Sequence, residues 1–170
     1  MTTDNYAFCA NCVNRIFNPN VTLSWNKGNI MSGKVAILPF TDFDSTDLND
    51  KEKVFNNVYE EITGLPVYND ICVMRTIKCN NVPNYNTYMA AAQKCRMITF
   101  KQLYKYDVRH LFLFGNAWQC MFDCAPIRHY KSGDLHIYHN YSPGVAYYDA
   151  DKFAIFKQQF AEDIKLSNSY

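Results

Sequence analysis

The sequence predicts a three-layer α/β/α fold built on a four-stranded, mainly parallel sheet. Two observations support this: four short apolar runs are bounded by turn residues, and helical patterns lie between them. Strands that alternate with helices form β-α-β units, and helices then cover both faces of the sheet. A length of 170 residues suits a single domain over residues 1–170.

The four predicted strands are rich in β-branched and aromatic residues, as buried strands usually are. They cover residues 34–40, 70–77, 110–114 and 135–139. In a parallel sheet of this kind, ligands bind beyond the carboxyl ends of the strands. The residues that follow each run are therefore the candidate site residues.

Four segments have the periodicity of amphipathic helices. They cover residues 49–64, 86–106, 116–122 and 149–164. In the first segment, Val54, Val58 and Ile62 recur at four-residue spacing, and acidic residues crowd the first turn. In the last segment, four apolar residues share one face and Asp149 is the expected N-cap.

Composition narrows the possible partners and the location. The net charge is +1, so any DNA binding must come from a local patch rather than from a global field. No apolar run reaches the roughly 18 residues that span a bilayer, and no secretory signal is visible. We therefore expect an intracellular, cytoplasmic protein with no membrane partner, in which the seven cysteines form no disulfide framework. Abundant Asn, Tyr, Lys and Phe also hint at an AT-rich, viral genome.

Four cysteines form a candidate metal site. Cys9 and Cys12 form a C-x-x-C pair, Cys79 ends the second strand, and Cys95 lies sixteen residues further on in the next helix. Structural zinc sites usually have two tight pairs, whereas only one is present here. Four thiolates from three places in the fold suit a [4Fe–4S] cluster, with zinc as the alternative. The remaining alternative is that Cys79 and Cys95 are small buried apolar residues.

Several motifs together resemble the iron–sulfur uracil-DNA glycosylases of family 4. These are the N-terminal C-x-x-C, "EITGLPVYNDICVMRTIKC", "VRHLFLFGNAWQCMF", and "IYHNYSPG" followed by "KFAIFKQQFAEDIKL". Their order and spacing match over residues 9–165. The resemblance implies a [4Fe–4S] cluster on Cys9, Cys12, Cys79 and Cys95. It also implies a DNA-repair hydrolase that flips uracil out of the duplex and breaks its N-glycosidic bond.

The resemblance assigns roles to residues after the strands. His139 matches the histidine of the family's HPS-type loop, which can donate a hydrogen bond to the departing uracil anion. Pro39 matches the proline of the family's GEAPG motif. Phe40 stands where the related family 1 enzymes, with GQDPYH, place a tyrosine that excludes thymine, so it is expected either to wall the base pocket in the same way or to fill it. Asp42 is the nearest carboxylate that can position a water. Asn116 is expected to join these residues at the carboxyl edge.

The chain also departs from the family pattern at the pocket. Arg75 stands where the family has an asparagine that reads the uracil edge, and arginine has no acceptor for the N3–H group. Ile37 replaces the motif's glutamate and cannot hold a water, and Asn140 replaces the proline after His139. Three tyrosines near this loop are candidates for stacking on bases or wedging between them: Tyr141, Tyr147 and Tyr148.

Two hypotheses follow. The first is a divergent glycosylase that excises uracil or another modified base, using His139 and Asp42. The second is an inactive glycosylase-like module that binds DNA or a protein partner, for instance in a viral replication or virion assembly. In either case Lys78, Arg128 (in a predicted basic loop, 125–133) and Tyr141 are candidate DNA contacts. The alternative is that these charges are ordinary solvated surface.

Overall fold

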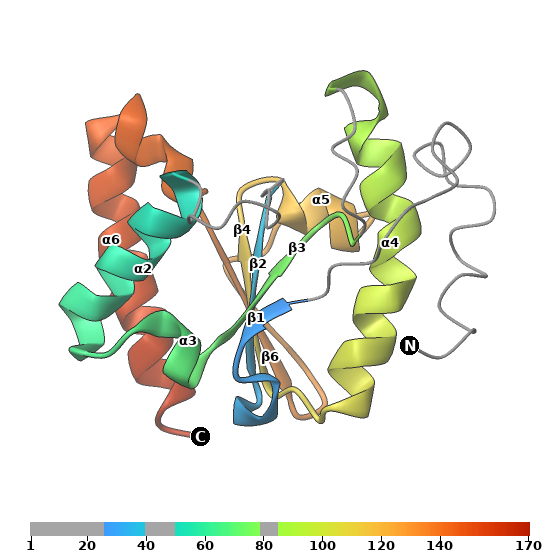
Figure 1. The fold of residues 1–170 in the computed structure, drawn as a ribbon, viewed down its shortest axis with the longest axis horizontal. Coiled ribbons are helices and arrows are strands. Elements are labelled where there is room, and N and C mark those ends of the chain that lie inside the picture. The colour runs from blue at the N-terminus through green and yellow to red at the C-terminus, as the bar shows by residue number, and fades with distance from the viewer. Residues whose placement is uncertain (1–25, 40–49, 79–84) are drawn as a thin grey trace.

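The protein has an α/β fold in which helices cover both faces of one six-stranded sheet (Figure 1). The structure is a computed structural model that describes residues 26–39, 50–78 and 85–170. Within these ranges, no helix is long and apolar enough to cross a membrane. The predicted fold class is therefore confirmed at the level of an α/β protein.

The strand order in the sheet is β1-β3-β2-β4-β6-β5. The four central strands are parallel to one another and correspond to the four predicted runs. The six strands are β1 (Asn26–Gly28), β2 (Lys34–Leu38), β3 (Cys72–Arg75), β4 (His110–Phe114), β5 (His129–Ser132) and β6 (Leu135–Asn140).

The prediction of only four strands is wrong, because a short antiparallel strand closes each edge of the sheet. β1 pairs with β3, and β5 pairs with β6. All four residues of β5 are exposed, so this strand lacks the buried alternation that marks a strand in a sequence. The hydrogen bonds to β6, and not local hydrophobicity, hold these residues in the sheet.

The helices form a layer on each side of the sheet, as Figure 1 shows. One layer contains α2 (Asp50–Thr63), α3 (Val67–Asp70), the short 3-10 helix η3 (Pro143–Tyr147) and α6 (Ala150–Ser167). The other contains α4 (Tyr85–Lys105) and α5 (Ala117–Met121). A further 3-10 turn, η2 (Ile30–Ser32), precedes β2. The predicted N-cap is confirmed, because the Asp149 side chain accepts a hydrogen bond of 3.0 Å from the Lys152 amide.

Alternation along the strands divides the core into two apolar clusters. In β2, Ala36 and Leu38 face the α2 and α6 side, whereas Val35 and Ile37 face the α4 and α5 side. The first cluster is rich in phenylalanine, and its aromatic rings pack edge-to-face across the sheet and α6. Both faces are therefore buried, and the ends of the central strands emerge from a rigid platform.

Candidate functional site

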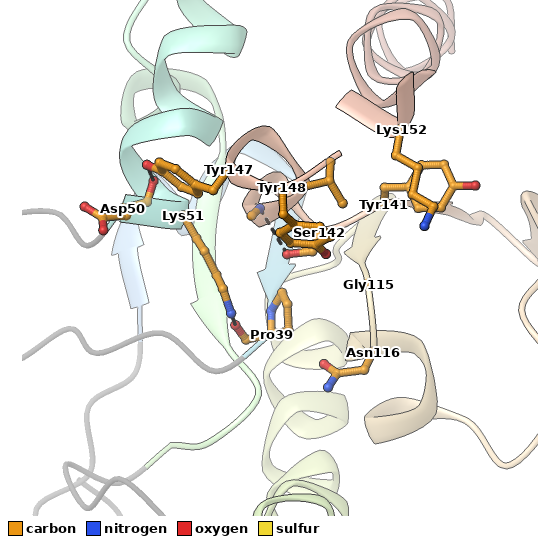
Figure 2. A pocket seen from close by; sticks show the side chains of 12 residues that line it. Pro39, Asp50, Lys51, Gly115, Asn116, Tyr141, Ser142, Tyr147, Tyr148 and Lys152 are labelled. Carbon is orange, nitrogen blue, oxygen red and sulfur yellow. Dashed lines mark hydrogen bonds between the residues drawn. The ribbon is translucent and has the colours of Figure 1, made fainter. Parts of the chain in front are cut away.

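A cavity of about 590 Å³ lies at the carboxyl edge of the parallel strands (Figure 2). Pro39 follows β2, Gly115 and Asn116 follow β4, and Tyr141 follows β6. These residues converge because the carboxyl ends of parallel strands meet at one edge of the sheet. The predicted place of the site and the expected positions of Asn116 and Tyr141 agree with this cavity.

The opposite wall of the cavity comes from α2, η3 and the start of α6. Its residues are Asp50, Lys51, Ser142, Gly144, Val145, Tyr147, Tyr148 and Lys152. Together with Tyr141, the tyrosines form an aromatic rim, and Tyr147 and Tyr148 are 61% and 74% exposed. Large aromatic side chains this exposed have π-faces available to a ligand.

Lys51 extends from the first turn of α2 towards the end of β2, as Figure 2 shows. Its Nζ lies 3.5 Å from the carbonyl oxygen of Pro39. Burial lowers the pKa of Lys51. Among the ion pairs that join described residues, none includes Lys51. This amine is half-buried at the cavity, and no carboxylate of a described residue pairs with it.

Lys152 is the second cation at the cavity, and its surroundings differ. Its Nζ lies 3.1 Å from Asp149, and the hydrogen bond to this carboxylate raises the pKa of Lys152. The Nζ also lies 6.0 Å from the centre of the Tyr141 ring. Lys152 is thus an exposed, charged side chain at the mouth of the cavity.

Gly115 joins the β4 and β6 ends of the cavity. Its φ of +55° lies in the left-handed region, and a Cβ added there would come within 2.9 Å of the Ser142 Cβ. Its amide donates a 2.8 Å hydrogen bond to the Asn140 carbonyl. The turn after β4 can therefore pack directly on the loop after β6 only if residue 115 lacks a side chain.

His139 does not line the cavity. Its Nε2 lies 3.0 Å from the Gly115 carbonyl oxygen, which can only accept, so Nε2 carries a proton and donates it. The ring packs edge-on against Trp118 at 5.5 Å, and burial lowers the pKa of His139. In this arrangement the neutral ring links the ends of β4 and β6, and its Nε2–H group is already engaged within the protein.

Two predicted site residues, Arg75 and Lys78, are buried and do not line the cavity. Arg75 ends β3 and is 2% exposed, so it does not line the cavity with Asn116. Lys78 is completely buried, and burial lowers its pKa to about 8. The expectation that Lys78 contacts DNA phosphates at the surface is therefore wrong for this structure.

Arg128 is also occupied within the fold. Its guanidinium pairs with the buried Asp163 at 2.7 Å and donates to the Gln159 carbonyl at 3.0 Å. Burial raises the pKa of Asp163 to about 6 despite this pairing. Arg128 therefore ties the start of β5 to α6, which leaves it poorly placed for the predicted DNA contact.

The predicted metal ligands lie mainly outside the described residues. Cys9, Cys12 and Cys79 are outside, as are Phe40 and Asp42 of the predicted pocket. Among the described residues, no group of three or more metal-ligating side chains occurs.

Cys95 is the one predicted ligand that the structure describes. It is 5% exposed on α4, where its thiol interacts electrostatically with the buried Lys78 amine. Lys78 directly precedes Cys79 in the chain.

No family model matches the chain, and none of the curated proteins matches it significantly.

Sequence reasoning missed the two lysines of the cavity. Lys51 sits in an acidic first turn, where it looks like ordinary helix surface. The available signal was topological: α2 is the first described helix after β2 in the chain, so its first turn is expected near the carboxyl edge of the sheet. The position of Lys152 could have been predicted in the same way, because α6 begins soon after β6.

Proposed function

We propose that the protein is a uracil-DNA glycosylase-like protein that binds DNA and takes an unstacked nucleotide into the carboxyl-edge cavity. The observation that carries this proposal is the combination of three exposed tyrosines and two lysines around about 590 Å³ of space. The order of the sequence motifs is the reason for proposing this family. The cavity lies at the edge of the sheet where ligands of such folds bind.

Each group at the cavity suits one part of a nucleotide. The tyrosine rings can stack on bases, which is typically worth about 1–3 kcal/mol per base. Lys152, which its bond to Asp149 keeps charged, can neutralise a phosphate. The amide of Asn116 has both donors and an acceptor, so it can read a base edge that Arg75 could not.

The geometry favours binding over excision. The His139 Nε2–H group is already bonded to the Gly115 carbonyl, and His139 itself does not line the cavity. Ile37 is fully buried and apolar where the resembling family has a water-binding glutamate. We therefore place the glycosylase-like DNA-binding module first, and excision of uracil or a modified base is the alternative outcome of the tests below.

A pair of charge reversals tests the position of the binding surface. Lys152→Glu removes a cation at the carboxyl-edge cavity, while Lys131→Glu makes the same change on β5, at the amino end of β6. We expect Lys152→Glu alone to weaken binding of a fluorescent single-stranded oligonucleotide. It should also lower the slope of log affinity against log salt by about 1.

We expect Lys152→Glu to fold as the wild type does, so that a loss of affinity reports on DNA binding. A glutamate at position 152 stands three residues after the N-cap Asp149, where it completes a capping box. The melting temperature of Lys152→Glu should therefore be unchanged or slightly raised. Equal losses of affinity in both variants would show that binding does not use the cavity.

An excision assay decides between the two hypotheses. Purified protein is incubated with uracil-containing single- and double-stranded oligonucleotides, and abasic sites are read out by alkaline cleavage. We expect binding without cleavage. Turnover by the wild-type protein would instead make it a DNA glycosylase and would require a different donor for the departing base.

We further propose that Cys9, Cys12, Cys79 and Cys95 hold a [4Fe–4S] cluster. The support is the spacing of the cysteines and the burial of Cys95 beside the residue that precedes Cys79. The buried positive charge of Lys78 would suit an anionic four-thiolate centre. Such a cluster would tie the N-terminal segment to β3 and α4.

Metal analysis of protein purified without oxygen tests this site. We expect iron, a brown colour and loss of both in Cys95→Ser, while Cys124→Ser, an exposed cysteine outside the pattern, keeps them. One equivalent of zinc and no iron would keep the site but exclude the cluster. No metal of either kind would exclude the site.

A further inference from the structure

We propose that Lys51 captures the aldehyde of an abasic site in DNA by forming a Schiff base. Such a site lacks its base, and its deoxyribose equilibrates with a ring-opened form that has an aldehyde at C1′. This inference rests on the proposed function, because the damaged strand must first bind at the carboxyl-edge cavity. It names a substrate class for the same cavity: DNA that presents a sugar aldehyde in place of a stacked base.

The position of the amine carries the argument. Lys51 lines the cavity, and its stem packs beside Gly144, where an added Cβ would lie 3.4 Å from the Lys51 Cε. The Nζ makes one long contact of 3.5 Å, with the Pro39 carbonyl oxygen. No described carboxylate pairs with it. The nitrogen can therefore turn towards a ligand without breaking an ion pair to any residue that the structure describes.

The surroundings also favour the nucleophilic form of this lysine. An amine attacks a carbonyl only when it is uncharged, and burial lowers the pKa of Lys51. The neighbouring Lys152 is the natural comparison within the cavity, because its bond to Asp149 raises its pKa and keeps it charged. The two lysines thus have different roles: Lys152 attracts phosphate, and Lys51 reacts with the sugar aldehyde.

The step is balanced without a further reactant. The lone pair of the neutral Lys51 nitrogen forms a bond to C1′ of the aldehyde, and a proton moves from nitrogen to the former carbonyl oxygen to give a carbinolamine. The C1′–O bond then breaks and water leaves, with the second amine proton, so that a C=N bond joins protein and DNA. No oxidant or reductant is needed, and hydrolysis reverses the step.

Borohydride trapping tests the proposal. A labelled oligonucleotide with one natural abasic site is incubated with the full chain and sodium borohydride, which reduces the Schiff base to a permanent bond. We expect a covalent complex on a denaturing gel, with the adduct mapped to Lys51 by peptide mass spectrometry. An oligonucleotide with a tetrahydrofuran abasic analogue has no aldehyde and should bind without cross-linking.

Two matched variants identify the nitrogen. Lys51→Arg keeps the positive charge but removes the primary amine, so we expect at least a tenfold loss of adduct with binding to the tetrahydrofuran oligonucleotide retained. Lys53→Arg makes the same change at an exposed position two residues along the same helix and should leave the adduct unchanged. Retained binding also shows that the variant is folded.

The outcomes separate this inference from the proposed function. Binding of both oligonucleotides with no adduct, or an adduct that maps elsewhere and persists in Lys51→Arg, overturns the role of Lys51 and leaves DNA binding intact. Failure of the wild-type protein to bind either oligonucleotide overturns both proposals. The rate of trapping should rise with pH, because the neutral fraction of the amine rises.

Discussion

The two edges of the sheet each have a cavity, and they differ in how their charges are satisfied. The cavity at the amino edge has about 380 Å³ and is lined by residues from the starts of β2, β4 and β6 and from the end of α6. Its lining includes cations and histidines, whereas the lining of the carboxyl-edge cavity includes cations and tyrosines. At the amino edge, however, Lys34 and Arg109 are paired with carboxylates, and the histidines are stacked against other rings.

Named contacts show this pairing. Lys34 reaches Asp70 at 3.3 Å, and Arg109 reaches Asp107 at 2.8 Å. His136 stacks on Tyr170 with ring centres 4.3 Å apart. Burial lowers the pKa of the histidines here, so they are neutral parts of a packed ring stack.

The carboxyl edge leaves comparable groups available. Tyr147 and Tyr148 are exposed, Asn116 is exposed, and Lys51 has no carboxylate partner among the described residues. Similar side chains therefore serve different purposes at the two edges. At the amino edge they stabilise the fold, and at the carboxyl edge they are available to a ligand.

The largest expected difference in stability between the two edges comes from substituting one glycine at each edge by alanine. Gly115 and Gly33 both have positive φ, so either substitution should cost about 1–2 kcal/mol for a left-handed residue with a side chain. Only Gly115→Ala also forces a Cβ within 2.9 Å of Ser142, which adds about 1–3 kcal/mol of overpacking. The free energy of unfolding measured in urea should therefore be lower for Gly115→Ala than for Gly33→Ala. Equal losses would mean that the turn after β4 is not tightly packed.

The amino edge should be sensitive to acid. Burial lowers the pKa of His110 to about 4, below its ordinary value of 6.5. The folded state then binds fewer protons than the unfolded state, so this contribution is present above pH 6.5 and is lost as the pH falls towards 4. We expect a loss of roughly 1–3 kcal/mol over that range. The charged and titratable groups around His110 are His136, His129, Lys34, Arg109 and Tyr138.

The variant His110→Phe isolates this effect. Phenylalanine keeps the ring stack with His136 and Tyr138 but does not titrate. Asp163 acts with the opposite sign, because its raised pKa favours the fold as the pH falls below about 6. That contribution cancels when wild type and variant are compared by urea unfolding at pH 7 and pH 4.5. Parallel stability curves would contradict the assignment to His110.

The smallest effect is expected at the aromatic rim. Tyr148→Ala should weaken binding of single-stranded DNA by about 1–2 kcal/mol, as expected for the loss of one stacking ring, with little change in stability. Tyr104→Ala is the matched control, because Tyr104 is 92% exposed on α4 and lies outside the cavity. Fluorescence anisotropy at one fixed salt concentration compares the two. A loss in Tyr104→Ala of the same size would show that exposed tyrosines contribute wherever they lie.

The sequence by itself determined the central strands, four of the helices and the edge at which the candidate site lies. These features follow from local rules: hydrophobic periodicity marks each element, and parallel strands place their carboxyl ends together. The N-cap at Asp149 was readable for the same reason, since a cap is a contact within three residues.

Only the tertiary structure decided which residues at that edge face the cavity. His139 and Asn116 both follow or end strands, yet His139 bonds to the Gly115 carbonyl while Asn116 faces the open space. Lys78 was a candidate DNA contact in the sequence but is buried, whereas Lys51, which the sequence did not single out, lines the cavity. Burial and the choice of partner depend on residues far apart in the chain, and no local pattern records them.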